Sequence, residues 1–228
     1  MFSIVQPMTE GVLYMYHRAN DKVSFVTHFI GALLGVVGTV FVVAKPFLFS
    51  NITGLQLAAA IIFCTSLVAL YSASAAYHYA DETKEIRLML RKVDHSMIYV
   101  LIAGTYTPVC LVVFTQPKGA YFCAGIWAVA IIGVILKILW INCPRIISVA
   151  IYLMLGWSIL LDIPAISLFS FGGRLFLILG GGFYSVGALI YGIKRPNISA
   201  KFGFHEIFHI FVMLGSLMHF VMVALYIL

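Results

Sequence analysis

The C-terminal stretch FHEIFHIFVMLGSLMHFVMVALYIL, residues 204–228, decides how this chain folds. Its only Asp, Glu, Lys or Arg residue is Glu206. A helix needs about 20 apolar residues to cross the hydrocarbon core of a bilayer. The stretch is long enough to do so, and it therefore predicts a transmembrane helix.

The composition extends this prediction to the whole chain. Of 228 residues, 63% are hydrophobic and 10% are charged, and the mean hydropathy is +1.07. Soluble domains are about half apolar and a quarter charged. Because long uncharged runs recur throughout, we expect one polytopic membrane domain over residues 1–228, with residues 1–22 as an N-terminal flank and no separate soluble domain.

Seven segments have the length and hydropathy of a membrane span. Short connections with Pro, Gly, Asn and charged residues separate them. The runs are continuous and do not alternate, which favours helices over a membrane barrel and predicts an all-α, seven-helix protein. The predicted spans are Val23–Ala44, Gly54–Tyr77, His95–Phe114, Ala120–Ile141, Ile146–Leu168, Leu175–Ile193 and Phe204–Leu228.

The distribution of Lys and Arg predicts the orientation. Of the 14 Lys and Arg residues, all but Lys45, Lys118 and Arg174 fall on the flank or connections of one side. The positive-inside rule places that side, with the N-terminus, in the cytoplasm and the C-terminus outside. The net charge of +6 is therefore mainly a topology signal; it is compatible with anionic lipid headgroups and gives no support for nucleic acid binding.

The first apolar run and the cysteines both fit a protein that stays in the membrane. The first apolar run is full length and lacks a convincing cleavage site, so we expect no cleaved signal peptide. The four cysteines lie in or at the edge of spans, where thiols are usually small packing groups. We expect a multi-pass protein of the cell membrane, in keeping with a bacterial inner membrane.

His205, Glu206 and His209 form an H-E-x-x-H sequence at the start of the seventh span. This spacing presents two imidazoles to one metal ion and also occurs in zinc proteases. The predicted topology brings His78, at the end of the second span, and Asp94, at the start of the third, to the same membrane level. Ser74 lies one helical turn from His78 and shares its face.

Each of these residues also has a simpler interpretation. The two histidines of the seventh span could lie at the membrane interface, and Asp94 could cap the third helix. Ser74 could hydrogen-bond to its own helix. Ionisable groups are costly inside a membrane, however, and a bound cation would stabilise several of them together.

Three segments of the chain resemble the haemolysin III branch of the progestin and adiponectin receptor (PAQR) family, within the larger group that includes alkaline ceramidases. They are SASAAYHYA (72–80), KVDHSMIYVLIAGTYTPV (92–109) and HEIFHIFVMLGSLMHF (205–220). The resemblance spans nearly the whole chain and implies a zinc site. It implies that His78, His205 and His209 are the zinc ligands, that Asp94 holds the zinc-bound water, and that Ser74 lies nearby.

Several residues fall outside this assignment. Bacterial relatives tend to carry a Glu and an Asn before the histidine of the first span, whereas this chain has Asp21 and Ser24 before His28, which weakens an assignment there. We interpret His28 as a packed or interfacial residue, with a supporting role in the site as the alternative. His95 should point about 100° away from Asp94.

Two residues of the seventh span are also left out of the predicted site. His219 lies about 15 Å beyond His209 along the helix, too far to share an ion. We interpret Glu206 as a solvated carboxylate at the helix start, where the dipole favours it.

These residues predict a zinc-dependent hydrolase. Three neutral imidazoles leave zinc one open position, and zinc lowers the pKa of water there to about 7, with Asp94 as the group that orients it or takes its proton. We expect the partners to be the lipid bilayer and a membrane lipid whose amide or ester is cleaved near the inner leaflet. The alternatives are a pore-forming cytolysin, a receptor with a structural zinc site, and an intramembrane protease that uses Glu206. The sequence leaves the substrate and the oligomeric state open.

Overall fold

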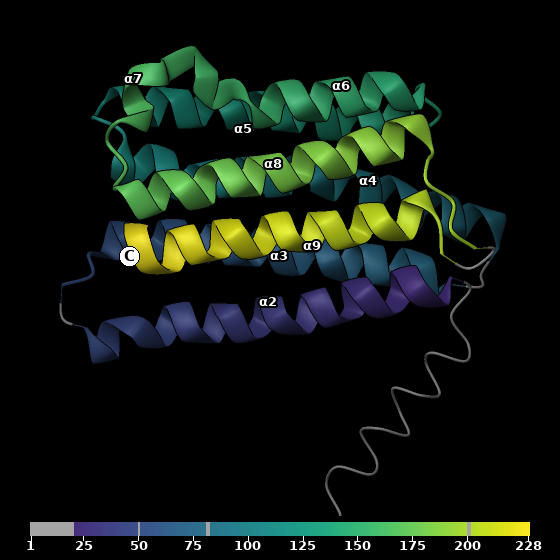
Figure 1. Ribbon diagram of the computed structural model, residues 1–228, viewed down its shortest axis with the longest axis horizontal. Helices are drawn as coiled ribbons and strands as arrows, with labels where there is room; N and C mark the ends of the chain where they lie inside the picture. The colour runs from purple at the N-terminus through teal and green to yellow at the C-terminus, as the bar shows by residue number, and fades with distance from the viewer. Residues whose placement is uncertain (1–20, 50, 81–82, 200–201) are drawn as a thin grey trace, which may run out of the picture.

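The computed structural model describes residues 21–49, 51–80, 83–199 and 202–228. Residues 1–20 of the predicted N-terminal flank lie outside this range. Within it, the protein is all-helical, with seven helical spans long and apolar enough to cross a membrane, as predicted (Figure 1). The elements are α2 (Lys22–Leu48), α3 (Gly54–Tyr79), α4 (Lys84–Pro108), η1 (Val109–Val113), α5 (Lys118–Leu139), α6 (Arg145–Gly156), η2 (Ser158–Asp162), α7 (Ile163–Ile166), α8 (Phe171–Ile193), α9 (Phe204–Met222) and η3 (Val223–Ile227).

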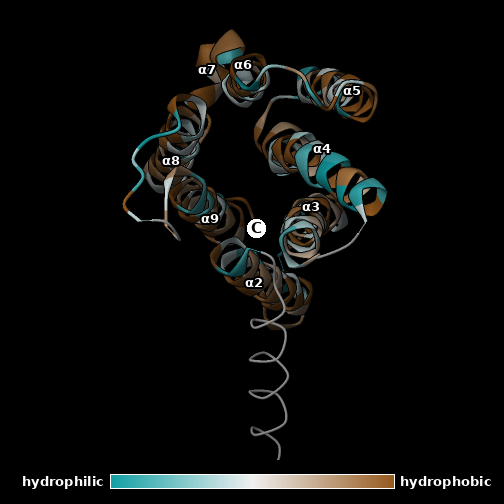
Figure 2. Cartoon of the chain, turned by 90° about the vertical axis from the view of Figure 1, so that its right-hand side faces the viewer, coloured by the Kyte–Doolittle hydropathy of each residue, from teal (hydrophilic) through white to brown (hydrophobic). Residues whose placement is uncertain are grey.

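The spans run up and down and form a ring when seen from one end (Figure 2). Consecutive helices pack on each other in the pairs α2 and α3, α3 and α4, α4 and α5, and α8 and α9, and α2 also contacts α9. The first span therefore lies between α3 and α9. This position matters because α3 and α9 carry the predicted metal ligands.

The outer surface of the bundle is apolar. Side chains such as Val37, Leu139 and Leu161 are 65%, 77% and 83% exposed, and brown, apolar ribbon dominates the view in Figure 2. In a soluble protein so many exposed apolar groups would be unfavourable, whereas lipid tails solvate them well. The four cysteines are free thiols, and Cys64, Cys110 and Cys123 are buried, as expected of packing groups.

The third span begins earlier than predicted. The sequence places its start at His95, but α4 begins at Lys84, where the side chain of Thr83 accepts a hydrogen bond from the Ile86 amide at 3.5 Å. The charged segment that we expected to be a connection is therefore helical, and it is the polar part of α4 in Figure 2. Hydropathy does not detect this part of α4, because a helix can continue beyond the hydrocarbon core, where its residues need not be apolar.

The fifth span is interrupted. The sequence predicts one helix over Ile146–Leu168, whereas α6 ends at Gly156 and is followed by the 3-10 helix η2 and the short helix α7, with Pro164 in its first turn. Glycine and proline both disfavour a helix interior. When each span is taken whole, with its 3-10 and π segments, the largest difference in its ends apart from the start of α4 is four residues: Ala44 against Leu48, and Leu175 against Phe171.

Small residues let α2 approach α3 closely. A Cβ atom at Gly31 would lie 2.8 Å from the Tyr71 ring, and one at Gly35 would lie 3.1 Å from the Val68 side chain. Glycines at such contacts allow close packing of membrane helices. Tyr71 also donates a hydrogen bond to Ser216 Oγ at 2.6 Å, so α2, α3 and α9 are held together below the predicted site.

Candidate metal centre

Three histidines meet at one end of the bundle, which we call the site end. His78 lies in the last turn of α3, and His205 and His209 lie in the first two turns of α9. One nitrogen from each ring can be chosen so that the three lie within 4.8 Å of one another. His78 Nε2 lies 3.4 Å from His205 Nε2. The structure thus brings together the three predicted metal ligands.

One pair of these rings has the nitrogen separation of a tetrahedral metal site. Two nitrogens bound to one zinc ion at about 2.05 Å are about 3.3 Å apart, close to the separation of His78 and His205. Nδ1 of His209 is buried and has no hydrogen-bond partner among the described residues. An orphaned buried nitrogen is costly, and a metal ion beside it would remove that cost.

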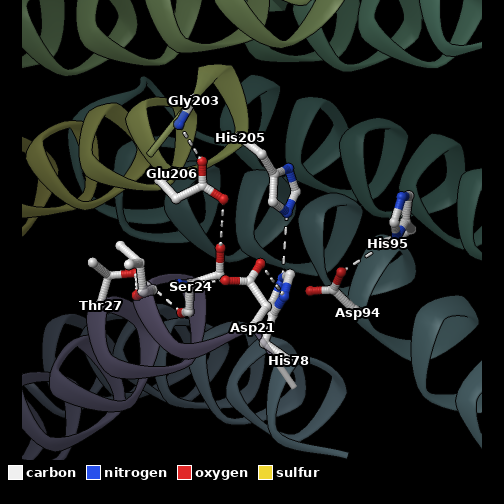
Figure 3. A network of polar contacts seen from close by, with 10 residues as sticks. Asp21, Ser24, Thr27, His78, Asp94, His95, Gly203, His205 and Glu206 are labelled. Atoms are coloured by element: carbon white, nitrogen blue, oxygen red, sulfur yellow. Dashed lines mark hydrogen bonds and ion pairs between the residues drawn. The ribbon is translucent and has the colours of Figure 1, made fainter. Parts of the chain in front are cut away.

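Asp21 supports the cluster from α2 (Figure 3). Its Oδ2 lies 3.2 Å from His78 Nδ1, and its backbone N–H donates to the His78 carbonyl oxygen at 3.1 Å. The carboxylate also accepts a hydrogen bond from the Ser24 amide, which makes Asp21 the N-cap of α2. A carboxylate on the second nitrogen of a histidine is the usual partner of a metal-bound imidazole.

Hydrogen bonding keeps Asp21 ionised. Its partial burial would raise the pKa, but the hydrogen bonds from His78 and Ser24 outweigh that effect and lower it to about 2. From the sequence, we take Asp21 as a departure from the bacterial pattern that weakens a site assignment near His28. That interpretation does not predict the contact of Asp21 with His78. The available signal was spacing, because Asp21, Ser24 and His28 fall on one face of α2.

Glu206 acts at the start of α9 rather than in the cluster. It is half-buried, and its Oε2 accepts a hydrogen bond from the Gly203 amide at 2.6 Å. Its Oε1 lies 3.5 Å from Ser24 Oγ. The prediction of a carboxylate at the helix start is confirmed, but Glu206 is less solvated than expected because the start of α2 covers it.

Asp94 lies mid-helix and does not cap α4, because Thr83 does. Its Oδ2 lies 3.3 Å from His95 Nδ1, so the two side chains meet although we expected them to diverge. Figure 3 shows His78 between the carboxylates of Asp21 and Asp94. Ser74 is buried one turn before His78 and lines the same cavity as Asp94.

His28 packs directly on a predicted ligand. Its ring stacks on that of His209 with centroids 3.7 Å apart and an interplanar angle of 7°, and both its nitrogens are buried without a partner among the described residues. The prediction of a packed histidine holds, although the residue it packs against belongs to the site. His219 instead has Nε2 3.4 Å from the Leu177 carbonyl oxygen and is outside the cluster, as predicted.

Two histidines of the cluster, His205 and His209, line a cavity enclosed by several helices. Its volume is about 190 Å³, well above the roughly 10–15 Å³ that one water needs. His205, His209 and Asp94 line it together with apolar side chains from α4 and α6, such as Ile98 and Leu153. A ligand with an apolar part could therefore reach the imidazoles.

Comparisons with known proteins agree with this architecture. The family model described as haemolysin-III related matches residues 16–220. The chain is 34% identical over 213 residues to a "Hemolysin-3 homolog" of Bacillus subtilis (strain 168), covering 93% of this chain and 96% of that protein. It is 33% identical over 223 residues to "Hemolysin-3" of Bacillus cereus, covering 97% and 98%. With seven apolar spans and bacterial relatives, it is a multi-pass protein of the bacterial plasma membrane, and it belongs to the haemolysin III-related family, a part of the PAQR family.

Proposed function

We propose that this protein is a zinc-dependent membrane hydrolase that cleaves an amide or ester of a membrane lipid, in the manner of a ceramidase. One observation carries the proposal: three imidazoles form a cluster, and two of them, His205 and His209, line a cavity with largely apolar walls together with the carboxylate of Asp94. Catalytic zinc sites use three protein ligands and keep one position open. By the positive-inside rule, the site faces the cytoplasmic leaflet.

His78, His205 and His209 would hold the zinc, and Asp21 would fix the orientation of His78. When bound, zinc supplies a Lewis acid that activates water and polarises a carbonyl group. In this scheme Asp94 would accept a proton from the water as its oxygen bonds to the carbonyl carbon, and would return that proton to the leaving amine or alcohol. The acyl C–N or C–O bond then breaks, and a carboxylic acid is released.

Two other residues assist in this scheme. His28 packs against His209 and limits the movement of that ring. Ser74 contributes a hydroxyl to the cavity wall near His78. In this scheme both are positioning residues, because His28 acts through the His209 ring and Ser74 lies one turn before His78.

The test is turnover by purified, zinc-loaded protein on a panel of acyl-amide and acyl-ester lipids. We expect release of fatty acid from at least one member, and loss of that release in Asp94→Asn protein that still binds zinc. Glu85→Gln is the matched control, because Glu85 is exposed in the first turn of the same helix. If the wild type binds the lipids and hydrolyses none, the proposal is wrong.

The names of the two relatives favour a second candidate, lysis of membranes by a pore. Such a protein would release a dye from liposomes without any chemical change to their lipids. Dye leakage that persists in His78→Ala and Asp94→Asn proteins would favour the pore. Leakage that requires both residues would point to lipid hydrolysis as its cause.

A further inference from the structure

Lys137 is a buried cation in the wall of the cavity. Its side chain comes from the last turn of α5, and the residue is 4% exposed. Its Nζ donates a hydrogen bond to Ser148 Oγ at 2.5 Å and lies 5.9 Å from the centre of the Tyr152 ring. Lysines at a membrane boundary normally extend to water, and this one points into the protein instead.

Two guanidinium groups also line this cavity, those of Arg91 and Arg145. Arg145 covers the Tyr191 ring at 4.4 Å and donates to the Tyr191 carbonyl oxygen at 3.3 Å. Arg91, from the polar part of α4, lines the same cavity. We call Arg91, Lys137 and Arg145 the cationic wall. Because a guanidinium stays charged at any physiological pH, this wall is positive whatever the state of Lys137.

The described residues do not neutralise the cationic wall. Asp94 is the one Asp or Glu side chain that lines the cavity, and its carboxylate pairs with His95. The other ion pairs of the described residues join Asp21 with His78 and Lys118 with Asp162. Like charges gathered in a site of low dielectric are unfavourable unless an anion accompanies them.

We propose that the cationic wall binds the anionic headgroup of an acyl lipid, with a phosphate group as the fitting chemistry. Lys and Arg together bind phosphate oxygens through charge-assisted hydrogen bonds. The wall lies beside the imidazoles, because the Tyr191 ring that Arg145 covers is also 5.9 Å from the His205 ring, centroid to centroid. Apolar side chains, including Ile98, Leu101 and Ile102, line another part of the same cavity. A phosphate on the wall would hold an acyl chain in the apolar part and its linkage near the imidazoles.

This inference rests on the proposed function for the identity of the cleaved bond, but its test does not need turnover. The probe is hexadecylglycerol phosphate with an ether-linked chain, which a hydrolase of amides or esters cannot cleave. Two ligands serve for comparison: neutral hexadecylglycerol, which has the same chain, and inorganic phosphate. Binding is measured at equilibrium on the full-length protein in nanodiscs of zwitterionic lipid.

We expect the wild type to bind the phosphate probe at least about tenfold more tightly than the neutral one, since a hydrogen bond to a charged group is typically worth a factor of ten or more. Lys137→Met should remove most of this preference, and Lys137→Arg should keep part of it. Lys84→Met is the matched control: it removes one charge from the exposed start of α4 at the same end of the bundle, and it should change nothing.

Three results would overturn the inference. In the first, the wild type binds both probes with equal affinity. In the second, Lys137→Met lowers the affinity for both probes equally. In the third, inorganic phosphate binds as tightly as the phosphate lipid probe. If Lys137→Met protein does not fold, Arg145→Gln replaces it under the same criteria.

Hydrolysis of ester-linked counterparts separates the two proposals. A phosphate preference without turnover leaves the cationic wall in place and disproves the hydrolase. Equal turnover of neutral and phosphorylated esters would support the hydrolase and contradict phosphate binding by the cationic wall.

Discussion

The carboxylate of Asp21 lies 3.2 Å from Nδ1 of His78, while Nε2 of the same ring lies 3.4 Å from His205. One imidazole thus has a carboxylate on one side and the candidate metal cluster on the other. This arrangement fixes the tautomer of His78, because the Nδ1–H donates to Asp21 and leaves Nε2 free to bind a cation. The residue that caps the first span therefore orients a candidate metal ligand of the second.

Asp21→Asn should weaken zinc binding by about 10–100-fold, the usual effect of losing such a carboxylate. Asn is also a good N-cap, so α2 should keep its start and the loss should report the charge. The measurement is competition for zinc with a chelator of known affinity. Glu85→Gln, which removes a carboxylate from the exposed first turn of α4, serves as the control. Unchanged affinity in Asp21→Asn protein would show that the contact does not support the metal.

His78→Ala and His209→Ala should each lose stoichiometric zinc, because two imidazoles alone do not form a zinc site of the usual four ligands. Zinc content after dialysis against a low concentration of free zinc measures this. His95→Ala is the informative control, since His95 contacts Asp94 but lies outside the cluster; it should retain one zinc per chain. Equal zinc in all three variants would remove the basis for the centre.

Most of the fold follows from the sequence because lipid imposes one simple requirement on every span. Around 20 apolar residues are needed whatever the span packs against. The predicted bounds are wrong where this requirement does not decide the structure. The first turns of α4 extend beyond the hydrocarbon, and the break after Gly156 depends on a local interruption inside an apolar run.

The site could be predicted only in part for a different reason. His78, His205 and His209 are placed by helix direction and by spacing along one face, both of which are readable from the sequence. The contact between Asp21 and His78, and the stacking of His28 on His209, depend on α2 lying between α3 and α9. The spacing of Asp21, Ser24 and His28 puts them on one face, but it does not show which distant segments that face contacts.

Asp94→Asn should reduce kcat on a lipid substrate by about 10²–10⁴-fold, the usual contribution of a general acid or base. Glu206→Gln should change kcat little, because Gln can replace Glu at this capping position and Glu206 is engaged with Gly203. The measurement is steady-state hydrolysis with zinc content checked in both variants. An intramembrane protease that used Glu206 as its base would give the opposite order.

Gly31→Ala should destabilise the protein by about 1–3 kcal/mol, the usual cost of overpacking a tight contact. The added Cβ would lie 2.8 Å from the Tyr71 ring, and α2 or Tyr71 would have to move. Gly125→Ala is the matched control, because nothing lies within 4 Å of a Cβ there, so the substitution should be neutral or stabilise α5 by up to about 1 kcal/mol. Thermal unfolding in detergent compares the two. Because α2 carries Asp21, Gly31→Ala should also weaken zinc binding while Gly125→Ala should not, and equal effects of both would contradict close packing of α2 on α3 as the support of the site.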